Sequence, residues 1–456
     1  MSEPSPTALS RLRAELADSP PLWWALLYFF SLLCGYYVLR PVRDAMGASA
    51  DAATLFPDRL LAWSATVGID LHAYTLQVLF TLTFLVMVAL QPLYGWLVSR
   101  WPRRVFLPVV YSAFIACLMA FWWAFDRELP GRGVLFFVWV AVFNLFAVTV
   151  FWSYMADVFD NDHAKRVYGY IGAGGTIGAL TGPAITRMLV GTLGVDRLLL
   201  VSAGFLLLCL LCIVMLRPWA MRREQREGRD GRGAAMGGSI WAGLRLVAAD
   251  PLLRALALLM FFGVGVGTLL YNEQAAIVRQ AYPTAEAATR FYSSLDWAIN
   301  GLTIVIQLFL TRWLLRRHGV GPALLVPAFA ILVGYCLLAA SPLPLLVALV
   351  QIATRAGEFS LSKPARETIY TRVDRQSRYK AKAVIDTAVY RFGDLTWVWT
   401  HKLLSVIGSK LVFLAGIGIA AGLVVGAWKV VREQRRLPEQ AGAATVRAPA
   451  RDPALG

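Results

Sequence analysis

A tyrosine, two arginines and an aspartate close the first hydrophobic stretch of the chain, in the sequence Tyr36-Tyr37-Val38-Leu39-Arg40-Pro41-Val42-Arg43-Asp44. An uncharged run from Leu22 to Leu39 leads into these charges, and a helix of about 20 apolar residues crosses the hydrocarbon core of a membrane. Tyr36, Arg40 and Arg43 recur at helical spacing and share one face, with Asp44 beside them. Guanidinium groups bind phosphate through paired hydrogen bonds. Because ionisable groups at membrane depth are costly and usually functional, we predict an anion-binding surface here. In the alternative interpretation, the arginines only mark the helix end and extend to the membrane surface.

Later hydrophobic stretches also carry charges. Arg355 lies about 18 Å beyond Leu343 at the helical rise per residue, so it falls near the middle of its stretch, and Glu358 follows three positions on. One broad helix face of the next stretch carries Asp386, Tyr390, Arg391 and Asp394. Two earlier stretches add Asn272, Glu273, Asp296 and Asn300. We expect these groups to line a central cavity.

The balance of these charges leaves the ligand open. Four basic residues (Arg40, Arg43, Arg355, Arg391) face six acidic ones (Asp44, Glu273, Asp296, Glu358, Asp386, Asp394). A cavity for a polyanion should be positive. Some acids must therefore lie outside the cavity or serve as gating partners and proton sites, or else the ligand is not a polyphosphate. Buried charges must be paired, so a pair such as Arg355 and Glu358 could also be purely structural.

Composition sets the class of protein. The 456 residues are 58% hydrophobic and only 16% charged, whereas a soluble domain has about 25% charged residues. We therefore expect a polytopic membrane protein. No cleavable signal peptide is expected, because the first residues carry Arg11, Glu15 and Asp18 and end in Pro20-Pro21.

The net charge of +16 follows membrane topology and does not indicate a nucleic-acid surface. Basic clusters at Arg100–Arg104, Arg217–Arg232, Arg312–Arg317, Lys363–Lys382 and Lys429–Arg436 fall on one side of alternating hydrophobic stretches. This is the positive-inside pattern. It places both termini in the cytoplasm, and we expect the inner membrane of a bacterium.

Twelve crossing helices are predicted, approximately at 22–47, 74–98, 105–125, 134–157, 167–191, 198–216, 254–278, 293–315, 321–340, 343–362, 382–406 and 409–431. They divide the chain into a cytoplasmic segment (1–21), a six-helix half (22–216), a cytoplasmic linker (217–250), a second half (251–431) and a disordered tail (432–456). Within the linker, 240–247 has the pattern of a short amphipathic helix. We predict an all-α bundle whose two similar halves rock about a central site. The five cysteines lie in apolar runs and the four histidines are scattered, so we expect packing, no metal site and no cofactor.

Two glycine-containing motifs resemble signatures of the major facilitator superfamily. The loop Gly95-Trp96-Leu97-Val98-Ser99-Arg100-Trp101-Pro102-Arg103-Arg104 is similar to Gly-x-Leu-x-Asp-Arg-x-Gly-Arg-Arg, with Ser99 in place of the aspartate and Pro102 in place of the second glycine. The alternative is a plain basic loop on the inside. Gly169, Gly178 and Gly182-Pro183 resemble the superfamily's antiporter signature, without its trailing glycine pair. Glycines at this spacing also allow close helix packing.

A narrower resemblance is carried by Leu39-Arg40-Pro41-Val42-Arg43-Asp44, Ala164-Lys165-Arg166-Val167-Tyr168, Leu270-Tyr271-Asn272-Glu273-Gln274 and Tyr379-Lys380-Ala381-Lys382-Ala383-Val384-Ile385-Asp386. Together these look like the non-mitochondrial ATP/ADP translocases, in a distant free-living bacterial branch. The resemblance implies an essential basic residue at Arg43, another at Lys380 or Lys382, and an essential acid at Glu273. The family often has an acid before Ala-Lys-Arg, where this chain has His163 next to Asp162.

We therefore predict a monomeric secondary transporter of an anionic, phosphorylated metabolite, with ATP/ADP exchange implied by the resemblance. The expected substrate-binding residues are Tyr36, Arg40, Arg43, Arg355, Arg391, Lys380 and Lys382. The expected gating or coupling residues are Asp44, Glu273, Asp296, Glu358, Asp386, Asp394, Arg100, Lys165 and Arg166. The alternatives are a proton-coupled transporter of a peptide-, sugar- or drug-like solute and, less favoured, a scaffold or sensor that does not transport. The sequence has no Walker loop, zinc spacing or nucleophile motif, so no enzyme is expected.

Overall fold

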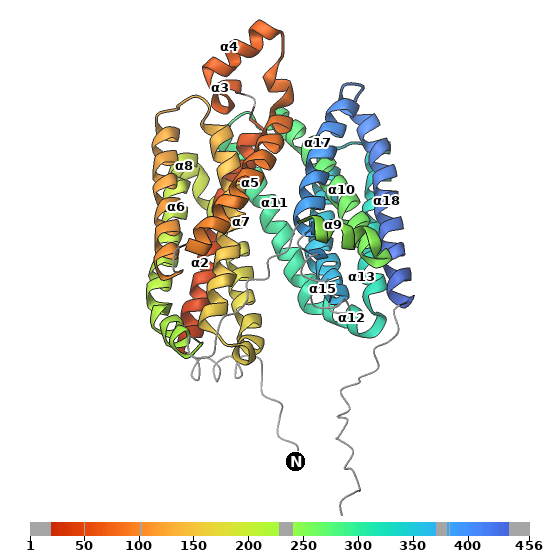
Figure 1. Ribbon diagram of the computed structural model, residues 1–456. Helices are drawn as coiled ribbons and strands as arrows, with labels where there is room; N and C mark the ends of the chain where they lie inside the picture. Colours follow the sequence, from red (N-terminus) through yellow and green to blue (C-terminus); the bar gives the residue numbers. More distant parts are fainter. Residues whose placement is uncertain are drawn as a thin grey trace, which may run out of the picture.

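Two helical bundles stand side by side in the computed structural model, which describes residues 20–49, 51–100, 103–227, 240–370, 381–382 and 384–436 (Figure 1). The first bundle contains α2 (Pro20–Gly47), α3 (Ala52–Leu55), α4 (Asp58–Val67), the 3₁₀ helix η1 (Leu71–Tyr74), α5 (Thr75–Arg100), α6 (Arg103–Asp126), α7 (Arg132–Val158) and α8 (Asn161–Glu227). After α9 (Ile240–Ala249), the second contains α10 (Pro251–Ala281), α11 (Ala285–Ile306), α12 (Arg312–His318), α13 (Val320–Ala340), α14 (Pro344–Gly357), α15 (Lys363–Tyr370), α17 (Tyr390–Ser405) and α18 (Ser409–Arg436). Three π-helical turns belong to the second bundle: η2 (Gln307–Thr311), η3 (Glu358–Ser362) and η4 (Val384–Val389).

The described residues contain twelve membrane-crossing segments, as predicted. Ten helices are long and apolar enough to cross a membrane by length and composition. One of the ten, residues 166–222, is a single continuous stretch that contains two crossing segments. Its helix is interrupted at Gly194, where φ is 79°, and one segment lies on each side of this residue. A positive φ of this kind favours glycine, which has no Cβ to clash with the backbone. The remaining crossing is made by η4 and α17; α17 has 16 residues and carries Arg391, Asp394 and Lys402, so it falls short of the apolar length of the others.

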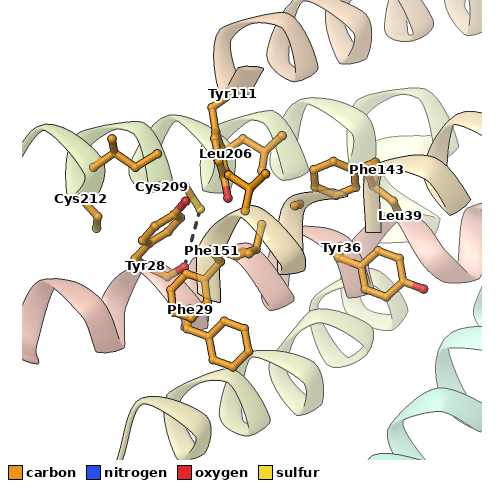
Figure 2. Packing of buried hydrophobic residues seen from close by; sticks show 14 of the residues in the cluster. Tyr28, Phe29, Tyr36, Leu39, Tyr111, Phe143, Phe151, Leu206, Cys209 and Cys212 are labelled. Carbon is orange, nitrogen blue, oxygen red and sulfur yellow. Dashed lines mark hydrogen bonds between the residues drawn. The ribbon is translucent and has the colours of Figure 1, made fainter. Parts of the chain in front are cut away.

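Each bundle has its own apolar core. The cluster in the first bundle draws its buried residues from positions 22–216, and the cluster in the second from positions 247–431. Figure 2 shows part of the first core, where Tyr28, Tyr111 and Phe151 meet around Cys209. The Cys209 thiol donates to the Tyr28 carbonyl at 3.7 Å, and Cys209 and Cys212 are free thiols that pack in the core, as predicted.

A third apolar cluster joins the two bundles at one end. It combines Leu55, Leu76 and Phe137 of the first bundle with Tyr292 and Val398 of the second, among others. At the same end, shown at the top of Figure 1, α3 and α4 extend beyond the bundle. These short helices and η1 lie between the first two crossings, where no element was predicted.

Helices α2 and α18 have their outer ends, Pro20 and Arg436, at the opposite end of the molecule, the lower end in Figure 1. Helix α8 continues through residues 217–227, so it runs further than the predicted start of the loop. The amphipathic helix expected at 240–247 is present as α9.

Candidate functional site

A cavity of about 750 Å³ lies between the two bundles and is lined by side chains from both. This size is within the range of pockets that hold small ligands. Among the described residues, its charged lining consists of Arg40, Arg43, Arg355, Lys363, Arg366 and Arg391 against Glu358, Glu367, Asp386 and Asp394. The described part of the lining is therefore positive, with six basic groups and four acidic ones.

This lining resolves the charge balance that the sequence left open. Asp44, Glu273 and Asp296 are nine-tenths or more buried and are not among the described lining residues. Lys363 and Arg366 are lining residues that the sequence analysis did not single out. Because these three acids lie outside the described lining and these two basic residues belong to it, the lining has a basic excess where the sequence suggested an acidic one.

Asp44 binds both arginines of the first crossing helix. Arg43 approaches Asp44 Oδ1 through Nη2 at 2.5 Å and through Nε at 2.9 Å, and the Nε atom of Arg40 lies 3.9 Å from Asp44 Oδ2. Tyr271 of α10 donates its hydroxyl hydrogen to Asp44 Oδ1 at 3.0 Å. Asp44 thus holds the two arginines in place and connects the first bundle to the second.

Arg40 also pairs across the bundles. Its Nη1 atom lies 3.0 Å from Oδ1 of Asp296 in α11, and the two side chains are 8% and 3% exposed. Two charges at this depth are stable only when paired, because desolvation of a lone charge costs several kcal/mol. Arg40 and Arg43 of the predicted helix face therefore line the cavity. Asp44 of the same helix and Asp296 of α11 neutralise them from outside the described lining.

Arg355 and Arg391 face the cavity from the second bundle. Arg391 Nη1 lies 3.4 Å from Asp394 Oδ2, and Thr268 donates to the other carboxylate oxygen at 3.3 Å. Arg355 is half-buried and forms no ion pair among the described residues. Its guanidinium therefore lines the cavity without a carboxylate partner in this described part of the chain.

Glu358 does not pair with Arg355, as considered from the sequence, but with Arg366, whose Nη2 lies 2.7 Å from Glu358 Oε1. The reason is the π-helical turn that begins at Glu358. A π turn holds more residues than an α turn, so a residue eight positions further returns to the same face after two turns. Such π-helical turns frequently occur at functional sites, and this one carries Arg366 and Lys363 to the cavity wall.

Glu273 has a partner that the sequence did not indicate. Its Oε1 atom lies 2.8 Å from His401 Nε2, and both side chains are buried. The other ring nitrogen of His401 is buried with no hydrogen-bond partner among the described residues. Glu273 of α10 therefore contacts α17 and pairs with none of the cavity arginines among the described residues.

Helix α17 of the second bundle is hydrogen-bonded to η1 and α5 of the first bundle. Gln77 donates to the Val398 carbonyl at 3.2 Å, and Trp399 donates from Nε1 to Thr81 Oγ1 at 3.2 Å. Lys402 donates to the Ala73 carbonyl. The bundles are therefore bonded to each other at the same end where the third apolar cluster lies.

The other predicted residues have different positions. Tyr36, Asp386 and Tyr390 line the cavity. Lys382 is absent from the described lining and pairs with Glu367, with Nζ 2.6 Å from Oε2. Arg166 also lies outside the described lining. Lys380 lies outside the described residues, and Arg100 and Lys165 belong to α5 and α8 but their side chains lie outside the described parts.

The glycine motif in α8 packs against α2. A Cβ atom at Gly178 would lie 2.3 Å from the Phe30 carbonyl oxygen, and one at Gly182 would lie 2.7 Å from the Cys34 carbonyl oxygen. At Gly169 a Cβ would meet nothing within 4 Å. Two of the motif's glycines therefore permit close helix contact.

Sequence comparison identifies distant relatives that span most of the chain. The ADP,ATP carrier protein 1 of Chlamydia muridarum is 25% identical over 467 residues, which cover 88% of this chain and 85% of the relative. The protein of the same name from Chlamydia trachomatis is 24% identical over 472 residues, with the same coverage. The resemblance to ATP/ADP translocases is thus confirmed as distant but nearly full-length similarity.

Solved structures with the same fold include the nucleoside transporter NupG as a D323A mutant, with a TM-score of 0.61 and 13% identity over 91% of this chain and 99% of that one. The D-xylose-proton symporter has a TM-score of 0.60 and 14% identity, and the match covers 89% of this chain and 96% of the symporter chain. The family model "Major Facilitator Superfamily" matches residues 2–170 and 45–389. The chain belongs to the Major Facilitator Superfamily and is a multi-pass membrane transporter, not an enzyme.

Proposed function

We propose that this secondary transporter moves an anionic, phosphorylated metabolite, and that its specific activity is exchange of nucleotides of the ATP/ADP type. The observation that carries the proposal is the positive cavity, in which Arg355 has no ion-pair partner among the described residues and Arg40, Arg43 and Arg391 are paired with aspartates. Arginine binds phosphate in a bidentate manner, which suits this arrangement. The names of the chlamydial relatives point to the same class of substrate.

The mechanism we propose is alternating access. The contacts of Asp44 with Tyr271 and of Arg40 with Asp296 hold the bundles together at the closed end while the cavity is empty. An anion that binds the arginines competes with these aspartates. Binding therefore weakens the contacts between the bundles and permits the rocking motion that opens this end.

The open side of the cavity faces the cytoplasm in this proposal. Its lining extends to Glu367 and Tyr370 in α15, which lies toward the end where α2 begins (Figure 1). The positive-inside pattern assigns that end to the cytoplasm, with both termini on the same side of a bacterial inner membrane. The structure then corresponds to an inward-open state.

The experiment is uptake of labelled ATP into proteoliposomes that are empty or preloaded with ADP, with and without a proton gradient. Uptake that needs internal ADP and ignores the gradient is expected. Arg43→Ala should abolish it without loss of folded protein, because Asp44 keeps Arg40 and Tyr271 as partners. Arg127→Ala, at an exposed surface position, is the control. Full activity in Arg43→Ala would refute the role of Arg43, and no uptake of ATP under any condition would refute nucleotide exchange.

A second candidate is proton-coupled transport, and the buried pair of Glu273 and His401 favours it. Intramembrane ionisable residues outside a substrate cavity commonly belong to proton pathways. This candidate predicts uptake that is driven by a proton gradient into empty vesicles. It also predicts that Glu273→Gln abolishes driven uptake but retains exchange between loaded vesicles. Uptake that survives collapse of the gradient and requires an internal counter-substrate would exclude it.

A further inference from the structure

The second bundle contributes an apolar part to the cavity lining, here called the apolar branch. Helices α10, α13 and α18 each contribute to this branch, which includes Met260, Gly263, Gly267, Ala328, Ile331 and Leu423. From α13 and α18 the described lining contains only apolar side chains. The branch therefore differs in chemistry from the charged wall made by α2, α14, α15 and α17.

The first bundle has no such branch in the part of the chain that the structure describes. In order along each bundle, α13 and α18 correspond to α6 and to the second crossing of α8. Neither α6 nor residues 195–227 of α8 contribute to the described lining. The branch is thus a specific feature of one half and does not follow from the repeated architecture.

Two glycines on α10 keep the branch open. A Cβ atom at Gly267 would meet nothing within 4 Å, and one at Gly263 would meet only Leu423 Cδ1 at 3.7 Å. On α2, the corresponding first helix of the other bundle, the large side chains of Phe29 and Leu33 point into the cavity. The absence of side chains at the two α10 positions therefore leaves open space in the branch.

The branch is close to the phosphate-binding groups. Thr268, next to Gly267, donates to Asp394, which pairs with Arg391. Thr354 borders the cavity immediately before Arg355, and its hydroxyl is buried without a partner among the described residues. Tyr271 lies one turn beyond Gly267, about 6 Å along the helix axis. A phosphate at the arginines and an apolar group in the branch can thus belong to one small molecule.

We propose that this branch binds the apolar, ring-bearing part of a phosphorylated substrate, and that Gly263 and Gly267 determine this specificity. The inference rests on the proposed anion transport and assigns a binding position to the ring of its substrate. Transfer of an apolar ring from water into an apolar site is favourable and does not depend on charge. Phosphates with an aromatic body should therefore bind better than inorganic phosphate or phosphates of small polar compounds.

The test compares methyl phosphate with phenyl phosphate and 1-naphthyl phosphate, which share the same charged group. Affinity for the purified full-length protein is measured by calorimetric titration. Phenyl phosphate should bind at least about tenfold more tightly than methyl phosphate, as expected when most of a ring is removed from water. In Gly267→Leu the new side chain occupies the branch, so this gain should disappear while the affinity for methyl phosphate is retained.

Gly418→Leu is the matched control, because this α18 glycine is exposed, has open space around its Cβ position and lies outside the described lining. It should keep the full gain. Gly263→Leu tests the branch independently if Gly267→Leu does not fold. Equal affinity of the wild-type protein for all three esters would overturn the inference but not anion binding. The same holds if folded Gly267→Leu or Gly263→Leu still binds phenyl phosphate more tightly than methyl phosphate by the wild-type factor. Failure of every ester to bind would instead refute the anion-binding function and the inference with it.

Discussion

Arg40 of α2 and Asp296 of α11 form an ion pair of 3.0 Å that joins the two halves of the transporter within the membrane. The same arginine lines the cavity. One side chain therefore contacts both the substrate space and the opposite half, which links occupancy of the cavity to the strength of the contact between the halves.

Removal of both partners of this ion pair should destabilise the protein by less than the two single removals added together. Arg40→Gln and Asp296→Asn each leave a buried group without its partner, at a cost of up to about 3–5 kcal/mol. The double variant should lose less than the sum of the two single effects. Thermal unfolding of the four proteins in detergent measures this coupling. Strictly additive losses would show that the pair does not stabilise this state.

Arg355→Gln should abolish anion binding with little effect on stability. Arg355 has no ion pair among the described residues, so its removal leaves no buried carboxylate unpaired. The contrast with Arg40→Gln is the informative result: both should lose anion binding, but only Arg40→Gln should unfold at a clearly lower temperature. Calorimetric titration with ATP, together with thermal unfolding, separates the two effects. Retained ATP affinity in Arg355→Gln would contradict the proposed binding site.

Gly178→Ala should be strongly destabilising, whereas Gly169→Ala should not. The first places a methyl group 2.3 Å from the Phe30 carbonyl oxygen, so α8 must move away from α2. Forced shifts of this kind cost about 1–3 kcal/mol. The second adds a methyl group in open space and gains up to about 1 kcal/mol of helix stability. Denaturation in a mild detergent measures both changes, and equal stability of the two variants would contradict the close packing.

A short cross-link between Thr81→Cys and Trp399→Cys should arrest transport. The native side chains are joined by a hydrogen bond of 3.2 Å across the closed end, so a link there prevents the halves from separating. The variant is made in a background without the five native cysteines. Transport should return when the link is reduced. A cross-linked protein that transports at the normal rate would show that this end does not open.

The sequence predicted the crossing helices well because hydropathy and length largely determine a membrane span. It also identified Arg40, Arg43, Arg355 and Arg391, since charge within an apolar stretch is visible without a structure. Which charges face the cavity was not predictable. Asp44 belongs to the same helix face as the arginines, but it turns toward Tyr271 and supports them from outside the lining.

Other parts of the site depend on contacts between distant segments. Glu273 and His401 are 128 positions apart, and no local pattern connects them. Arg366 lines the cavity after a π-helical turn, but it lies beyond residue 362, where the crossing helix was predicted to end, because the basic residues that follow were assigned to a cytoplasmic loop. The signal that could have identified Arg366 was its position eight residues beyond Glu358 within one helical stretch.

The two separate apolar cores also have a consequence for biogenesis. The first core is complete once residue 216 has been inserted, because its buried residues come from positions 22–216. Domains generally fold in order during synthesis, so this half can pack before the second exists. Arg40 of this half is then inserted before Asp296, its ion-pair partner in the second half, has been synthesised. Until α11 has been inserted, Asp44 is the acidic partner of Arg40 among the described residues of the first bundle, so the intrahelical pair must neutralise this arginine while the second half is being made.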